Sequence, residues 1–258
     1  MPAAANAPIA IEVAIDSVAG ARAAAAAGAH RLELCQCLEQ GGLTPSRGLL
    51  EAVKAAVRLP VFVMIRPRPG DFLYDDGEFA VMRRDAELLR AAGADGVVSG
   101  VLLASGELDR ARLRELRLAT GPAPFTCHRA FDLCADAARA LDTLIELGVP
   151  RVLTSGQAAS APAGAAAIRA LVQRAADRLM VMAGAGVRDG NVRDLVAASG
   201  VREVHLSATR WQPSRMVFRR PDVPMGAALP ADEYTLRATD GDLIGRVVAA
   251  LCEPSAGR

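Results

Sequence analysis

Eight short apolar runs recur along the chain at a steady interval, and they limit the possible folds more than any other feature. The runs lie near 9–15, 31–35, 61–65, 96–99, 124–128, 151–154, 179–183 and 203–207. The stretches between them are rich in Ala, Leu, Arg and Glu and have helical patterning. Eight strands alternating with helices over 258 residues predict one domain, residues 1–258, with the α/β fold of a (β/α)8 TIM barrel. A doubly wound open sheet is the alternative.

The turns that lead into the strands repeat one arrangement, which favours the barrel. In each, a helical stretch ends at a glycine that takes the left-handed cap conformation. The four turns contain Gly28, Gly93, Gly148 and Gly200.

Two helix starts are also visible in the sequence. Thr44-Pro45 predicts an N-cap before a helix over 46–58. Asp75 with Glu78 predicts a capping box before a helix over 77–92.

Two segments fall outside the repeat. Residues 1–8 are expected to form a flexible N-terminus. Residues 209–239 contain the only tryptophan, Trp211, and are expected to form a long loop before a final helix near 240–252. Loops of that length in a compact domain usually have a functional or interfacial role.

Composition excludes several classes of function. The net charge of +1 is not that of a protein that binds nucleic acid or a membrane surface. No apolar run reaches the roughly 18 residues of a membrane span, and the first basic residue is Arg22, so the positive start of a signal peptide is missing. Five cysteines without a CxxC motif indicate reduced thiols and a cytoplasmic protein.

Several strands carry polar residues on one face only. Side chains alternate along a strand, so residues of the same parity share a face. The large apolar set of each strand suits the side that faces the helices, which leaves the other set pointing into the barrel. The inward set is Glu12, Glu33, Arg66, Thr126, His128, His205 and Ser207. Such groups either form an internal network of Glu–Arg and Glu–His pairs or line a site at the C-terminal ends of the strands.

The strand that ends at His128 is the centre of this prediction. Its apolar lead-in is followed by His128, Arg129 and, three residues later, Asp132. A strand that runs into polar side chains and then a helix has its functional end there. In an enzyme, His128 would serve as acid or base beside Glu33 or Asp132.

The loops after the strands add groups that bind anions. Arg66 and Arg68 follow the third strand and present two guanidinium groups. Ser155 follows the sixth strand, and Gly184, Gly186 and Ser207 lie where barrels often hold phosphate. Together they predict a site for a small anionic ligand. The alternatives are that the glycines only form a tight turn and that Arg66 is fully occupied by Glu33 or Glu12.

The cysteines raise the possibility of a metal site. Soft thiolates select Cu(I) and zinc. Cys35 points inward by parity, and Cys37, two residues later, converges with it only if the chain turns at Gln36. Lone buried cysteines are more often small apolar residues than ligands.

The chain resembles the CutC family, named copper homeostasis proteins. The resemblance spans about residues 11–239 and rests on a set of short matching stretches. Those stretches are Arg31-Leu32-Glu33-Leu34-Cys35, Gly41-Gly42-Leu43-Thr44-Pro45-Ser46, Met64-Ile65-Arg66-Pro67-Arg68, Gly70-Asp71-Phe72, His128-Arg129-Ala130-Phe131-Asp132, Arg151-Val152-Leu153-Thr154-Ser155-Gly156, Met182-Ala183-Gly184-Ala185-Gly186-Val187 and Glu203-Val204-His205. The resemblance implies a TIM barrel, a cytoplasmic homo-oligomer and a role in copper handling without an established reaction.

The sequence departs from the family at three positions. The family often has a cysteine near the end of the first strand, proposed to bind Cu(I) together with the second-strand cysteine. Here Cys35 matches the second, but Ala14 replaces the first, so a two-thiolate site of that kind cannot form. Cys127 and Pro69 stand where the family usually has Phe and Gly.

Three hypotheses about function therefore stay open. The first is copper homeostasis with Cu(I) bound at Cys35, helped by Cys37 or an inward histidine. The second is a TIM-barrel enzyme that acts on a small anionic metabolite, with or without a phosphate group. The third is a sensor that binds the same ligand without catalysis.

Overall fold

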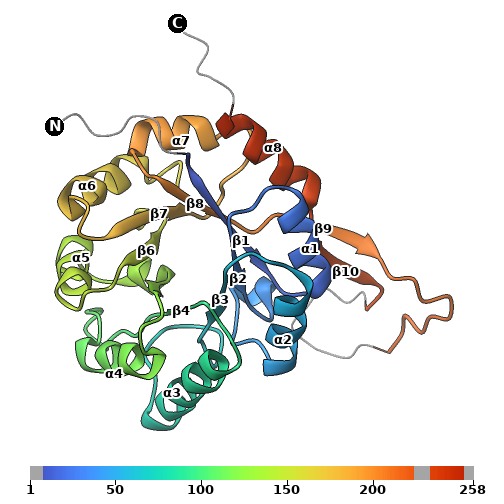
Figure 1. Cartoon of the computed structure of the whole chain (residues 1–258), viewed down its shortest axis with the longest axis horizontal. Coiled ribbons are helices and arrows are strands. Elements are labelled where there is room, and N and C mark those ends of the chain that lie inside the picture. The colour runs from blue at the N-terminus through green and yellow to red at the C-terminus, as the bar shows by residue number, and fades with distance from the viewer. Residues whose placement is uncertain (1–7, 224–232, 253–258) are drawn as a thin grey trace, which may run out of the picture.

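The computed structural model describes residues 8–223 and 233–252, and in this range parallel strands close into a barrel (Figure 1). The barrel strands are β1 (Ala10–Ile15), β2 (Arg31–Leu34), β3 (Val61–Met64), β4 (Gly96–Ser99), β5 (Phe125–Cys127), β6 (Arg151–Thr154), β7 (Met180–Gly184) and β8 (Glu203–Leu206). Each strand pairs with the next, and β8 returns to pair with β1. The closed sheet confirms the predicted TIM barrel and excludes the doubly wound open sheet.

The α-helices form a ring outside the barrel in Figure 1. They are α1 (Val18–Ala26), α2 (Arg47–Ala56), α3 (Asp76–Ala91), α4 (Arg110–Thr120), α5 (Ala137–Glu146), α6 (Ala165–Ala175), α7 (Val192–Ser199) and α8 (Gly241–Cys252). Two short 3-10 helices, η1 (Leu38–Gln40) and η2 (Arg129–Leu133), follow β2 and β5. Within the described ranges, none of the helices combines the length and apolar character that a membrane crossing needs.

The predicted helix ends are largely confirmed. The four turn glycines all have positive φ, between 65° at Gly148 and 98° at Gly93. Asp75 and Glu78 form the predicted capping box at the start of α3. The predicted start of α2 was wrong, because Ser46 is the N-cap and accepts a hydrogen bond from Leu49 N. Thr44 instead accepts one from the backbone N–H of Arg66 and ties this turn to the end of β3.

The apolar core has two parts, which lie on opposite faces of the barrel strands because side chains alternate along each strand. The larger part lies between the barrel and the helices and includes Ile11, Val13, Leu34, Cys127 and Val204. A smaller cluster, formed by Cys35, Phe62, Met64 and Val98, lies inside the barrel. Strand parity therefore sorts the side chains as expected, and the barrel interior is partly apolar and partly charged.

Charged residues at the N-terminal ends of the strands form an ion-pair network inside the barrel. Arg31, Arg151 and Glu203 are the first residues of β2, β6 and β8. Arg31 donates to Glu12 and Glu203, and Arg151 donates to both carboxylate oxygens of Glu203. Both guanidinium groups lie over the Phe62 ring, 5.0 and 5.6 Å from its centroid. These ion pairs contribute to stability, because removing one partner would leave the other charge buried and unpaired in the low-dielectric interior.

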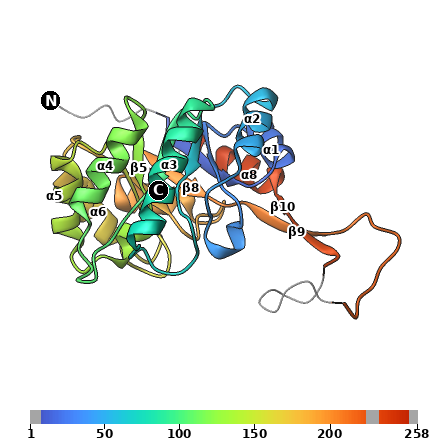
Figure 2. The ribbon, with the colours of Figure 1, turned by 90° about the horizontal axis from the view of Figure 1, so that it is seen from below.

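The segment 209–239 differs from the expected long loop. β9 (Thr209–Pro213) and β10 (Thr235–Thr239) pair as an antiparallel arm that projects beyond the helices in Figure 2. The pairing partners are more than twenty residues apart, so no local turn signal marked them, and their backbone hydrogen bonds replace those a loop would make with water. Large apolar side chains are exposed on the two strands, at Trp211 and Leu236, and on the segment that follows β9, at Met216, Val217 and Phe218. Most of the predicted flexible N-terminus, residues 1–7, lies outside the described residues.

The ion-pair network generates a stability prediction. Glu203→Ala leaves the Arg151 guanidinium without its partner, so we expect the free energy of unfolding to fall by about 3–5 kcal/mol. Urea denaturation at neutral pH measures this change. The matched control is Asp142→Ala, which breaks the exposed pair with Arg174 and should have a much smaller effect. Equal effects of the two substitutions would contradict a stabilising role for the network.

Candidate functional site

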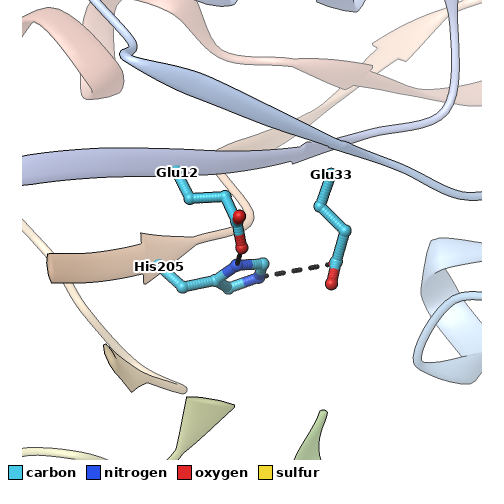
Figure 3. A group of neighbouring side chains, drawn as sticks. All are labelled: Glu12, Glu33 and His205. Carbon is cyan, nitrogen blue, oxygen red and sulfur yellow. Dashed lines mark hydrogen bonds and ion pairs between the residues drawn. The ribbon is translucent and has the colours of Figure 1, made fainter. Parts of the chain in front are cut away.

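Glu12, Glu33 and His205 meet inside the barrel, on β1, β2 and β8. Each is the third residue of its strand and is buried. The imidazole lies between the two carboxylates in Figure 3, with His205 Nδ1 2.8 Å from Glu12 Oε1 and His205 Nε2 3.7 Å from Glu33 Oε2. The closure of the sheet makes this possible, because the register of β1 and β8 places Glu12 beside His205.

The two carboxylates and the imidazole shift one another's pKa. Burial lowers the pKa of His205, but the Glu33 charge and the hydrogen bond to Glu12 outweigh it and raise the pKa above its usual value. Burial raises the pKa of Glu12, but His205 and Arg31 bring it down to about 2. Burial raises the pKa of Glu33, and the neighbouring Glu12 charge adds to that rise. These shifts favour an ionised Glu12, and they favour the protonated forms of His205 and Glu33 more than the free side chains would.

This group has the donor atoms of a metal site. One ligand atom from each of Glu12, Glu33 and His205 lies within 4.8 Å of the other two. Glu33 Oε1 is buried and has no hydrogen-bond partner among the described residues. Imidazole and carboxylate together suit zinc, copper, iron and manganese ions. We call Glu12, Glu33 and His205 the Glu–His group.

Of the two candidate metal-binding cysteines, only Cys35 is near this group. Its thiol donates to Glu33 Oε2 at 3.6 Å, and burial, reinforced by the Glu33 charge, raises its pKa well above the usual value. Cys37 is exposed, has φ 49° and precedes η1. Ala14 is buried beside Glu33 in the register of β1 and β2 and offers no ligand atom. The donor set is therefore nitrogen and oxygen with one neighbouring thiol, and it does not fit a two-thiolate Cu(I) site.

Arg66 lies apart from the Glu–His group. Its guanidinium donates to the carbonyl oxygens of Gln40, Gly42 and Gly70, at 2.9, 3.1 and 2.9 Å. It stacks over Phe72, 5.1 Å from the ring centroid. The alternative in which Glu33 or Glu12 occupies Arg66 is excluded, because the guanidinium turns toward the loops after β2 and β3.

His128 also packs against Phe72, with ring centroids 4.8 Å apart. Its Nδ1 accepts a hydrogen bond from Ala130 N at 3.2 Å. Burial, with the Arg66 charge, lowers the pKa of His128 to about 3. The imidazole is therefore neutral at pH 7, and its proton lies on Nε2. No hydrogen bond or ion pair among the described residues joins it to Glu33 or Asp132, so the structure does not bring together the predicted acid–base pairs.

Asp132, Arg129 and Ser155 satisfy one another. Asp132 accepts hydrogen bonds from the backbone N–H and hydroxyl of Ser155 and from the Thr154 hydroxyl. Arg129 donates to Asp132 and to Ser155 Oγ. These contacts fasten η2 to the end of β6 and leave the Asp132 carboxylate fully engaged.

The other predicted anion-binding residues are also separated. Arg68 donates to Glu78, Asp71 and the Leu73 carbonyl, so its guanidinium group is engaged by neighbouring residues of the chain. Ser207 is exposed beyond the end of β8. At Gly184, a Cβ would lie 2.6 Å from Leu153 Cδ1, so a larger residue there would require the Leu153 side chain to move. Gly186 has φ 72° and forms part of the following turn.

Sequence reasoning missed Arg31, Arg151 and Glu203. A usable signal was present, because these residues have the same parity as Glu33, Ser155 and His205 on their strands. Phe72 was also missed as the aromatic ring that contacts both Arg66 and His128, and its position depends on the path of the loop after β3.

The fold and the buried groups define a TIM-barrel protein with ionisable side chains inside the barrel and at the C-terminal ends of its strands. Residues 9–210 match the CutC family. The chain is 48% identical over 237 residues to a family protein CutC of Klebsiella pneumoniae (strain 342), covering 92% of this chain and 95% of that protein. It is 47% identical over 230 residues to a human copper homeostasis protein cutC homolog, covering 89% and 84%. The chain therefore belongs to the CutC family.

A solved structure agrees with this assignment. The crystal structure of CutC from Streptococcus agalactiae superposes with a TM-score of 0.73 at 31% identity, covering 76% of this chain and 97% of that one. The shared fold and the sequence identity of the curated relatives support one family over most of the barrel.

The buried neutral His128 generates a prediction about pH. Its pKa is lowered to about 3 in the folded state, against about 6.5 when unfolded. The unfolded chain then binds a proton that the folded chain does not, so stability falls as the pH drops below 6.5 toward 3. We expect a contribution of up to about 1.4 kcal/mol per pH unit, and His128→Gln should remove that slope in urea denaturation between pH 7 and 5. The slope is the readout, since the substitution itself changes the absolute stability at every pH. An unchanged slope would contradict the neutral buried imidazole.

Proposed function

We propose that this protein takes part in copper homeostasis by binding a copper ion at the Glu–His group, with Cys35 as the neighbouring thiol. The observation that supports this most directly is the approach of three donor atoms to within 4.8 Å of one another. The human relative is named for copper homeostasis, which agrees with a copper ion as the bound species.

The chemistry of the group gives each residue a role. Metal binding requires His205 to lose a proton. With the remaining proton on Nδ1, His205 donates to Glu12 and presents Nε2 toward Glu33. A carboxylate that orients a ligating imidazole in this way is common around protein metal ions. Glu12 would then orient the ring, Glu33 would supply oxygen, and Cys35 would supply the soft donor that Cu(I) prefers.

We further propose that the protein acts in the cytoplasm as a homo-oligomer. All five cysteines are free, which agrees with a reducing compartment. The β9–β10 arm projects beyond the helices in Figure 2, and Trp211 on β9 and Val217 and Phe218 on the segment that follows it are exposed. Apolar side chains gathered on a projecting arm are typical of a surface that contacts another protein.

The second candidate function is an enzyme or a sensor for a small anionic metabolite. It is favoured by a different observation, which is that Arg66 is buried and its guanidinium donates to carbonyl oxygens, with no ion pair among the described residues. This observation concerns the ends of β3 and β5 and does not depend on metal binding.

The copper proposal predicts that His205→Gln weakens copper affinity by at least about tenfold, because an imidazole ligand is lost. Competition with a chelator under reducing conditions measures Cu(I) affinity, and a parallel titration in air measures Cu(II). Cys35→Ala should weaken Cu(I) binding more than Cu(II) binding, since only Cu(I) strongly prefers sulfur.

Cys134→Ala serves as the matched control, because Cys134 is also a buried free thiol but lies beside Gln157. It should retain wild-type affinity for both ions. Unchanged affinity in His205→Gln would show that copper binds elsewhere, and unchanged Cu(I) affinity in Cys35→Ala would remove the thiol from the proposal.

A further inference from the structure

We propose that residues 37–42, which contain η1, form a lid over the Cys35 thiol, and that Arg237 of β10 and Arg66 at the end of β3 hold this lid shut. We call residues 37–42 the η1 lid. Opening of the η1 lid lets a metal ion reach Cys35 and the neighbouring Glu33, and this step rests on the copper function proposed above. The lid itself does not depend on which ion the Glu–His group binds.

The thiol is closed off from solvent by the η1 lid. Cys35 is fully buried. A Cβ at Gly42 would lie 2.9 Å from Cys35 Sγ, so the lid backbone lies directly against the thiol. Leu38 packs against the apolar cluster inside the barrel that contains Cys35. An ion therefore cannot reach this thiol unless the chain moves, and the η1 lid is the segment that lies against it.

The η1 lid can move without breaking a helix or a barrel strand. Gly41 N and Gly42 N donate to carbonyl oxygens within the lid, so these hydrogen bonds move with it. The two ends of the lid meet at a bridge in which Gln36 and Leu43 exchange backbone hydrogen bonds of 2.9 and 2.7 Å. Gly41 and Gly42 both have φ 86°. Small residues at the end of a segment can absorb the change in backbone angle that a hinge needs.

Two arginines hold the η1 lid from outside it. Arg66 donates to Gln40 O and Gly42 O, at 2.9 and 3.1 Å. Arg237 Nη1 lies 3.8 Å from Glu39 Oε2, which is an ion pair longer than a hydrogen bond. An ion pair of this kind is weak. Opening therefore requires the loss of few contacts, as is typical of segments that open locally while the rest of the protein stays folded.

Arg237 acts on a second carboxylate as well. Burial raises the pKa of Asp16, which follows β1, while the Arg237 charge opposes that rise and the Glu39 charge adds to it. Without Arg237, Asp16 and Glu39 would repel each other, and the repulsion would push the η1 lid away from the end of β1. Because Arg237 lies on β10, the β9–β10 arm determines how firmly the lid is held.

The rate at which N-ethylmaleimide alkylates Cys35 in the metal-free protein tests the lid, with mass spectrometry to measure each cysteine separately. Every protein in this experiment carries Cys37→Ser, because Cys37 is exposed and would react first. Cys127 is buried elsewhere and reports general unfolding. We expect Cys35 to react faster than Cys127, since local opening costs less than unfolding. Arg237→Gln should raise the Cys35 rate about fivefold and leave the Cys127 rate unchanged.

Two further variants separate loss of the ion pair from a general loosening. Glu39→Gln should raise the Cys35 rate by only about twofold, because it removes the repulsion from Asp16 together with the attraction to Arg237. It leaves β10 unaltered, so it tests the lid even if Arg237→Gln does not fold. Arg47→Gln is the matched control, since it breaks an exposed ion pair within α2 and should leave the Cys35 rate unchanged.

Stopped-flow measurement of Cu(I) uptake from a chelator complex connects the lid to the copper function. Arg237→Gln should take up Cu(I) faster, by about the factor by which its Cys35 rate rises. Unchanged Cys35 rates in Arg237→Gln and Glu39→Gln, or equal increases at Cys35 and Cys127, would overturn the lid whether or not copper binds. Faster alkylation with unchanged Cu(I) uptake would overturn its role in metal access. Faster alkylation in a protein that binds no copper would support the lid and count against the copper function alone.

Discussion

The cost of placing charge inside a closed barrel governs the organisation of this protein. The strand faces that point inward carry Glu12, Glu33, Glu203 and His205, together with the guanidinium groups of Arg31 and Arg151. None of these could stay ionised alone in such an environment. They form a continuous set of opposite charges instead, in which Arg31 joins Glu12 to Glu203 and His205 joins Glu12 to Glu33.

The polar groups inside the barrel differ between its two ends. At the N-terminal ends of the strands, Arg31, Arg151 and Glu203 pair their charges and both guanidinium groups rest on Phe62, although Arg151 Nη1 has no hydrogen-bond partner among the described residues. Toward the C-terminal ends, four residues have a buried polar atom without a hydrogen-bond partner among the described residues: Glu33, Arg66, Thr126 and His128. TIM-barrel proteins generally place stability at the first end and ligand binding at the second, and Arg66 and His128, which follow β3 and β5, lie at the second end.

Membership of the CutC family connects this interior to copper, but the residues place limits on how copper could bind. Ala14 excludes the pair of strand-end thiolates, and Cys37 is exposed on the turn that begins η1. The remaining donors are an imidazole, two carboxylates and one thiol of raised pKa. A protein with this set would bind copper through mixed ligands and would compete with protons for the site, since His205 and Cys35 must both lose a proton to act as ligands.

The sequence by itself determined the alternation of strands and helices, the turn glycines and the face on which each strand residue lies, because these depend on local periodicity and backbone conformation. It identified Glu12, Glu33, Arg66, His128 and His205 as inward groups, but not how they associate. Only the tertiary structure decided that Glu12 meets His205, 193 residues away, because the closure of β8 onto β1 sets that register. It also decided that Arg66 turns to backbone carbonyls and Phe72 instead of a carboxylate, because the path of the loops after β2 and β3 fixes which acceptors lie within its reach.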